Sequence, residues 1–137
     1  MKGVKITPED RIFSEFIRKR AMRLAGGCER CLAQKYDIVK DNGSIFPAWK
    51  QLQCSHYWTR GSLSVRYDED NACGLCGGCH IFFSSHHDQH ELFFRARLGE
   101  ERYERLNMRY LGGHGVDMKV VRIYVKQLLD EEDLHGK

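Results

Sequence analysis

The sequence predicts an α+β fold that is built around a small zinc site and flanked by helices. Two Cys-x-x-Cys pairs, Cys28/Cys31 and Cys76/Cys79, indicate the metal site. Short stretches rich in β-branched and aromatic residues lie between the pairs, and apolar residues recur at helical spacing before and after them. A length of 137 residues indicates one domain, 1–137. We expect an N-terminal helix at about 8–24, a core at about 28–98 and C-terminal helices at about 100–134.

The first helix has a clear start and a clear end. Thr7 is a good N-cap, Pro8 suits the first helical position, and Asp10 lies three residues after the cap. Apolar residues then recur at helical spacing up to the stop at Gly26. The other face of this helix is basic and carries Arg11, Arg18, Lys19 and Arg23.

The middle of the chain predicts strands. "YDIVKDNGSIFPAW" is typical of a hairpin whose turn is Asp41-Asn42-Gly43. "KQLQCSHYW" predicts a short strand, and "SVRYDEDN" predicts a second strand that runs into a polar loop. The core therefore combines a hairpin with a pair of short strands.

The last third of the chain predicts helices. "DQHELFFRARLG" and "EERYERLNMRYLG" are amphipathic segments, each ended by glycine. Asp117 is a suitable cap for a last helix with one apolar face, and we expect its acidic end, "DEEDLHGK", to be frayed.

The two cysteine pairs are the strongest local signal. Forty-four residues separate them, and each pair presents two thiolates from a tight turn, so that together they complete a tetrahedral site for a structural Zn²⁺. In a reducing cytosol, metal ligation is a better explanation of six cysteines than disulfides. Redox chemistry or plain burial of the thiols is the alternative.

Cys73 offers a second choice, because Cys73 and Cys76 have the same spacing as Cys76 and Cys79. Two glycines between Cys76 and Cys79 favour a sharp turn there, and hence this pair. Cys54 and Cys73 are then expected to be small buried apolar residues, although either could approach a metal.

Three polar residues lie among the cysteines in a suggestive order. His56 lies on a predicted strand, Asn71 in the following loop, and His80 directly after the last cysteine. A lone histidine in a strand is usually structural, but the order His, Asn, Cys-His favours a function. With the two cysteine pairs, this stretch resembles the HNH endonucleases, the ββα-metal nuclease family, and among them small phage-encoded enzymes and the Rap/NinG-type recombination nucleases. The resemblance runs from Phe13 to Leu106.

The resemblance implies a ββα-metal, treble-clef-like core and hydrolysis of DNA phosphodiester bonds, by nicking or double-strand cleavage. His56 would be the general base, Asn71 would hold the geometry around it, and His80 would bind one catalytic divalent ion, Mg²⁺, Mn²⁺ or Ni²⁺. An alternative is a zinc-stabilised module that binds DNA or protein and cuts nothing.

The chain departs from the usual metal ligands of this family. Ser55 stands where an Asp or His often precedes the base, and Phe83 and Ser84 stand where a second helix ligand is common. We expect His90 to join His80 as a ligand of the catalytic metal. The nearby His86 and His87 are either further ligands or parts of a polar loop.

DNA is the expected partner, with weak sequence preference, because no base-reading element is visible. The candidate phosphate contacts are Arg60, Arg66, Arg18, Lys19 and Arg23. A net charge of +3 is compatible with a polyanionic partner. The resemblance also implies phage packaging or recombination proteins as partners.

We expect a cytoplasmic protein, in the host cytoplasm if it is phage-encoded. The N-terminal stretch lacks the apolar segment of a signal peptide. No apolar run approaches the ~18 residues that a membrane-spanning helix needs.

Overall fold

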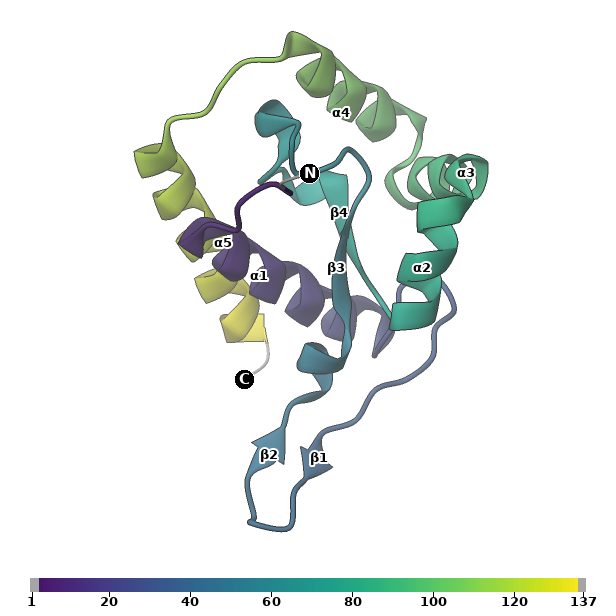
Figure 1. Cartoon of the computed structure of the whole chain (residues 1–137), viewed down its shortest axis with the longest axis vertical. Coiled ribbons are helices and arrows are strands. Elements are labelled where there is room, and N and C mark those ends of the chain that lie inside the picture. The colour runs from purple at the N-terminus through teal and green to yellow at the C-terminus, as the bar shows by residue number, and fades with distance from the viewer. Residues whose placement is uncertain (1–2, 136–137) are drawn as a thin grey trace.

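A computed structural model describes residues 3–135 of the chain (Figure 1). Its α-helices are α1 (Pro8–Ala25), α2 (Gly77–Ser85), α3 (His87–Leu98), α4 (Glu100–Gly112) and α5 (Met118–His135). Its strands are β1 (Ile38–Val39), β2 (Ile45–Phe46), β3 (Gln53–His56) and β4 (Ala72–Leu75). Three short 3-10 helices are η1 (Ala48–Gln51), η2 (Leu63–Val65) and η3 (Glu69–Asn71). The mixture of helices with two small sheets confirms the predicted α+β class.

An antiparallel pair of strands, β3 and β4, lies at the centre. The register places Gln53 opposite Leu75 and His56 opposite Ala72. In Figure 1, α1 and α5 lie together on one side of this pair, and α2 and α3 lie on the other. Every residue of β4 is buried as a result.

Apolar side chains form two clusters, which hold the helices to the central strands. One joins the strands to α2, α3 and α4 and includes Leu75, Phe83 and Phe94. The other joins α1 to α5 and includes Phe13 and Val125. Full burial of such a side chain stabilises the fold by roughly 1.5–3 kcal/mol, so these clusters fix the position of the helices around β3 and β4.

Gly74 allows α1 to lie directly on β4. A Cβ atom at this position would be only 2.5 Å from the Cβ of Ala21, which is too close for any side chain. The backbone N–H of Glu29 also donates to the carbonyl of Gly74 at 3.0 Å. The end of α1, where the first cysteine pair follows, is therefore held beside the end of β4, where the second pair follows.

The first helix begins and ends as predicted. The Thr7 hydroxyl accepts a hydrogen bond from the Asp10 N–H, and the Asp10 carboxylate accepts one from the Thr7 N–H, which makes a complete capping box. Gly26 ends the helix in the left-handed region at φ 70°, where a side chain would be strained. The predicted helix at 8–24 is confirmed within one residue.

The first hairpin is also confirmed and protrudes from the body of the molecule (Figure 1). β1 pairs with β2, and the Lys40 N–H donates to the Ser44 carbonyl across the turn. Ile38, Val39 and Ile45 are all exposed. This hairpin stands apart from both hydrophobic clusters.

The prediction of a strand at "SVRYDEDN" was wrong. This segment forms η2 and η3, and the second strand of the central pair begins at Ala72. Inward hydrogen bonds of Arg66 and Asn71, described below, fold the segment into turns. Apolar alternation alone could not reveal these contacts.

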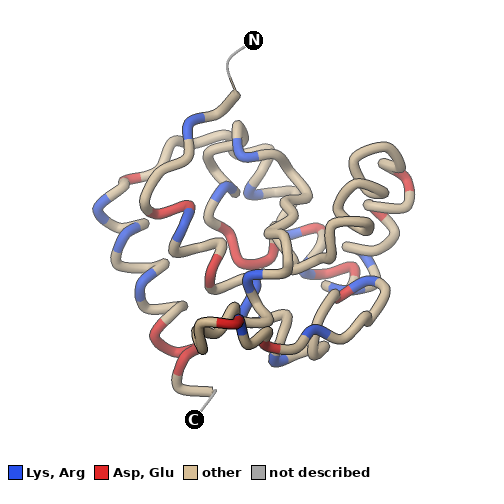
Figure 2. Tube along the Cα trace, turned by 60° about the horizontal axis from the view of Figure 1, so that its bottom comes forward, with Lys and Arg blue, Asp and Glu red and all other residues tan. Residues whose placement is uncertain are grey.

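The acidic end of α5 is ordered, which corrects the expectation that it is frayed. α5 continues to His135, and Glu132 is only 6% exposed. Glu132 accepts two hydrogen bonds from Arg23, and Asp133 accepts one from Lys19. Figure 2 shows acidic positions near the C-terminus. The ion pairs of Glu132 and Asp133 tie the end of α5 to α1.

The predicted helices after the core are confirmed. α3 and α4 end at glycines with positive φ, 81° at Gly99 and 61° at Gly113. The Asp117 carboxylate accepts a hydrogen bond from the Lys119 N–H at the start of α5, as expected of a cap.

Candidate functional site

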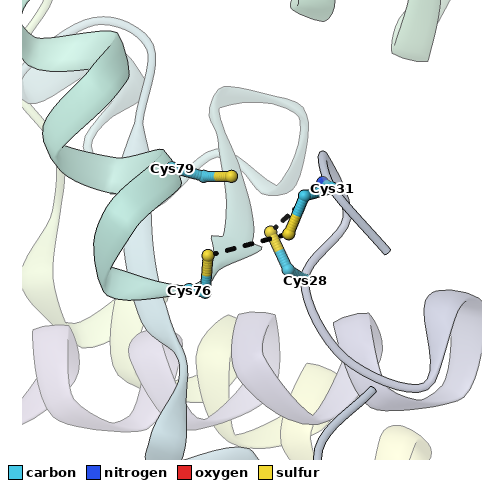
Figure 3. Close-up of side chains that lie close together, drawn as sticks. All are labelled: Cys28, Cys31, Cys76 and Cys79. Atoms are coloured by element: carbon cyan, nitrogen blue, oxygen red, sulfur yellow. Dashed lines mark hydrogen bonds between the residues drawn. The ribbon is translucent and has the colours of Figure 1, made fainter. Parts of the chain in front are cut away.

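The four cysteines of the two Cys-x-x-Cys pairs form one cluster (Figure 3). Cys28 and Cys31 come from the turn after α1, whereas Cys76 and Cys79 come from the start of α2. Their sulfur atoms all lie within 4.8 Å of one another and point to a common centre. Tetrahedral Zn–S bonds of about 2.3 Å place two sulfurs about 3.8 Å apart, and the Sγ atoms of Cys31 and Cys76 are 3.8 Å apart. The cluster fits a structural zinc ion.

Cys73 and Cys54 lie outside this cluster. Cys73 is fully buried in β4, and burial raises its pKa well above the usual value of a thiol. Burial likewise raises the pKa of Cys54 to about 12. Because the sulfur of Cys73 does not join the other four, the structure favours Cys76 with Cys79 over Cys73 with Cys76 as the second pair.

Neighbouring residues hold the first cysteine turn in place. Leu32 adopts a φ of 62°, and its N–H donates to the Cys28 carbonyl at 2.9 Å. Glu29 accepts hydrogen bonds from Arg97 and from the Gly74 N–H. Burial raises the pKa of Cys28, but hydrogen bonds from backbone N–H groups outweigh this and lower it to about 7. The turn is thus ready to present a thiolate.

His56 occupies the end of β3 and is partly buried. Its Nε2 donates to the backbone carbonyl of Arg66 at 3.1 Å, and its ring packs 5.8 Å from the ring of Phe13. Burial lowers the pKa of His56 to about 4, so the imidazole is neutral at physiological pH. With Nε2 carrying the proton, Nδ1 is a free acceptor.

One cavity gathers the histidines predicted from the sequence. We call it the histidine pocket; it has a volume of about 460 Å³. Its walls bring together His56 from β3, His80 from α2 and His90 from α3, and His87 also lines it. The other lining residues are Ser55, Tyr57, Trp58, Thr59, Ser62, Phe83, Ser84 and Tyr110.

Two buried imidazole nitrogens in this pocket lack a hydrogen-bond partner. These are Nδ1 of His80 and Nε2 of His90. A buried polar atom without a partner is costly, and such atoms often await an ion or a ligand. Imidazole nitrogens of this kind can bind a divalent ion. Among residues 3–135 the four cysteines are the only group of three or more ligand atoms within 4.8 Å of one another, so the histidines of this pocket do not form such a group.

Aromatic rings hold His90 in place. Its ring stacks on Phe83 at 4.7 Å and meets the edges of Tyr57 and Phe94 at 5.2 Å. Burial, and the charge that His87 and His80 would carry when protonated, lower the pKa of His90 to about 4. His90 is therefore a neutral, rigid imidazole beside two others.

Asn71 is fully buried and shapes the loop that follows β3. Its side-chain oxygen accepts from the Trp58 N–H at 2.8 Å, and its amide donates to the carbonyls of Trp58 and Val65. Its backbone carbonyl accepts from the Tyr57 N–H. These bonds fix the chain that follows His56 but do not touch the imidazole, so Asn71 acts on the position of the loop.

The structure corrects the expectation that Arg66 contacts phosphate. Arg66 is only 6% exposed, and its guanidinium donates to Asp10 and to the carbonyl of Lys5. Lys19 and Arg23 are also engaged, by the acidic end of α5. These ion pairs leave Arg18 and Arg60, of the five predicted residues, beside an open cavity.

That second cavity, the arginine pocket, has a volume of about 230 Å³. Arg11, Arg18 and Arg60 line it together with His56. Arg18 also lies 4.7 Å from the ring of Trp49, on η1. His56 lines both this pocket and the histidine pocket.

Arg11 was not among the predicted site residues, and the role of His87, as a metal ligand or as part of a polar loop, was left open. Arg11 shares a helical face with Arg18, seven residues on, and that spacing is visible in the sequence. His87 shares a face with His90, three residues on, which is also a visible signal. Nothing in the sequence shows that these faces meet His56.

The chain was compared with family models, curated proteins and solved structures, and none of them matches it. Between residues 3 and 135, no helix combines the length and the apolar character that crossing a membrane requires.

Proposed function

We propose that the chain is a metal-dependent endonuclease of the HNH type, which hydrolyses DNA phosphodiester bonds. The observation that carries the proposal is the position of His56, in the wall between the histidine pocket and the arginine pocket. A phosphodiester placed there meets a base, positive charge and candidate metal ligands at once. The order of β3, β4 and α2 agrees with a ββα-metal core.

His56 is the general base in this proposal. Its Nε2–H is bonded to the Arg66 carbonyl, so Nδ1 accepts the proton of the attacking water. Burial and the charge of Arg60 are among the causes that lower its pKa. A bound phosphate offsets the charge of Arg60, which raises the basicity of His56 when DNA is in place.

His80 and His90 are the proposed protein ligands of the catalytic ion, through the nitrogens that lack a partner. When bound, such an ion acts as a Lewis acid on the phosphate and stabilises the leaving oxygen. The cysteine site is separate, and its four thiolates suit zinc. The protein would thus use one structural and one catalytic metal.

DNA is held by its phosphates in this proposal. Arg11, Arg18 and Arg60 offer positive charge next to His56, whereas Lys19 and Arg23 are already paired within the protein. Phosphate contacts position a duplex without reading its sequence. We therefore expect weak sequence preference and affinity that falls steeply with salt.

A plasmid-nicking assay tests the proposal. Zinc-loaded protein should nick supercoiled plasmid when Mn²⁺ or Mg²⁺ is added, and His56→Ala should cut about 10²–10⁴-fold more slowly. His114 lies in the exposed loop between α4 and α5. His114→Ala is the matched control and should cut at the wild-type rate. Wild-type protein that binds DNA without cutting it would instead support a zinc-stabilised binding module.

A further inference from the structure

We propose that His87 completes a three-histidine site with His80 and His90, and that this site selects a transition-metal ion over Mg²⁺. The inference deepens the proposed nuclease function, on which the role of the ion in cleavage rests.

The junction between α2 and α3 brings His87 to the pocket. α2 ends at Ser85 and α3 begins at His87, with only His86 between them at φ −132° and ψ 73°. His87 and His90 are three residues apart on α3, so their side chains lie on one helical face. His80 approaches the same cavity from α2.

The three imidazole rings differ in how tightly the surrounding residues hold them. His90 is 9% exposed and held among aromatic rings, and His80 and His90 each have one buried nitrogen without a partner. His87 is exposed, so its ring can rotate toward an ion that the other two already hold. His80 and His90 are thus in place before the metal binds, and His87 turns toward the ion when it binds.

The chemistry of the pocket wall indicates the class of metal. No aspartate or glutamate lines the histidine pocket among the described residues, and the hydroxyls present belong to Ser55, Tyr57, Thr59, Ser62, Ser84 and Tyr110. Mg²⁺ prefers carboxylate and other oxygen ligands, whereas imidazole suits nickel, zinc and other transition metals. A site of three imidazoles therefore favours Ni²⁺, Zn²⁺ or another late transition-metal ion over Mg²⁺.

His86 provides a matched control, because it is the neighbour of His87 but faces elsewhere. Its ring stacks on Phe82 at 4.0 Å, and its Nδ1 donates to the Phe82 carbonyl at 2.8 Å. It does not line the histidine pocket. Removing it changes the number of surface histidines without changing the proposed site.

The test is calorimetric titration of Ni²⁺, and separately of Mg²⁺, into the full chain with its cysteine site loaded with zinc. We expect about one Ni²⁺ per chain and at least tenfold weaker Mg²⁺ binding. His87→Ala and His80→Ala should each weaken Ni²⁺ binding at least tenfold, and His86→Ala should leave it unchanged.

Three results would overturn the inference. Ni²⁺ binding unchanged in His87→Ala would remove that ligand, and equal losses in His86→Ala and His87→Ala would indicate a chelate on the surface. Ni²⁺ binding unchanged in His80→Ala would place the ion outside the pocket. Failure of the nuclease proposal is distinct: the Ni²⁺ titrations would come out as expected while no variant, nor the wild type, cuts plasmid.

Discussion

His56 is held by the backbone of Arg66, whose side chain is in turn locked to Asp10. The Nε2–H of His56 donates to the Arg66 carbonyl at 3.1 Å, and the Arg66 guanidinium donates two hydrogen bonds to the Asp10 carboxylate. Asp10 belongs to the first turn of α1 and also caps it. The start of the first helix therefore determines the orientation of the proposed base.

Asp10→Asn should destabilise the fold and slow cutting. It leaves the Arg66 charge buried without its partner, which typically costs about 3–5 kcal/mol, while the asparagine side-chain oxygen can still accept from the Thr7 N–H. Denaturant unfolding measures the loss. Asp41→Asn, in the exposed hairpin turn, is the control and should leave stability and cutting unchanged. Equal stability of the two variants would contradict a structural role for the ion pair.

Stability should fall as the pH drops from about 6.5 to 4. Burial lowers the pKa of His56 and of His90 to about 4, whereas an unfolded histidine titrates near 6.5. In this window the unfolded chain binds more protons than the folded one, so acid favours unfolding. The cost by pH 4 is on the order of 3 kcal/mol for each histidine.

Acid below this window should destabilise the fold further, through Asp10. Burial raises its pKa, but hydrogen bonds from Arg66 and Thr7 outweigh this and lower it. Its contribution is present above the usual aspartate pKa and is lost as the pH falls through the lowered value.

Unfolding free energies of wild type and His56→Gln, measured from pH 8 to pH 4, test the prediction for the histidines. Loss of zinc in acid affects wild type and His56→Gln equally. Parallel plots of unfolding free energy against pH for the two proteins would therefore contradict a buried neutral His56.

Purified protein should contain about one tightly bound zinc per chain, detected by elemental analysis. Structural zinc contributes about 10–16 kcal/mol of folding free energy in small domains, so Cys28→Ser and Cys76→Ser should be largely unfolded. Cys54→Ser should keep both zinc and fold, because Cys54 lies outside the cluster. A zinc-free protein with a native circular dichroism spectrum would contradict the assignment.

Asn71→Ala and His80→Ala should differ in their response to added metal. Asn71→Ala leaves the Trp58 N–H without its partner, at about 1–3 kcal/mol, and removes the side-chain bonds to the carbonyls of Trp58 and Val65. Its slow cutting should persist in excess metal, because the loop around His56 has lost its shape. His80→Ala should lose affinity for the ion, and excess metal should restore part of the rate in a plasmid assay. Equal rescue of both variants would show that these roles are wrongly assigned.

Local signals allowed prediction of the elements whose interactions are local. The cap at Thr7 and the stop at Gly26 set the bounds of α1, and the spacing of the cysteines identified the cluster. The order His56, Asn71, His80 selected residues that line or shape one pocket. The cap, the stop and each Cys-x-x-Cys pair are complete within a few residues of sequence.

Long-range partners could not be predicted in the same way. Arg66 resembles an exposed basic residue until Asp10, 56 residues earlier, is placed beside it. Glu132 resembles part of a frayed tail until Arg23, 109 residues away, donates to it. In both cases burial depends on a tertiary contact that no periodicity reveals.

The protruding β1–β2 hairpin lies in the segment between the two cysteine pairs. The four-cysteine cluster brings both ends of this segment together, and the close approach of Gly74 and Ala21 keeps the two ends in register. The length of the hairpin is therefore independent of the geometry of the histidine pocket. Doubling the length of a flexible loop costs only about 0.6 kcal/mol in closure entropy. The tip of the β1–β2 hairpin can therefore be lengthened, shortened or replaced while His56 stays in place.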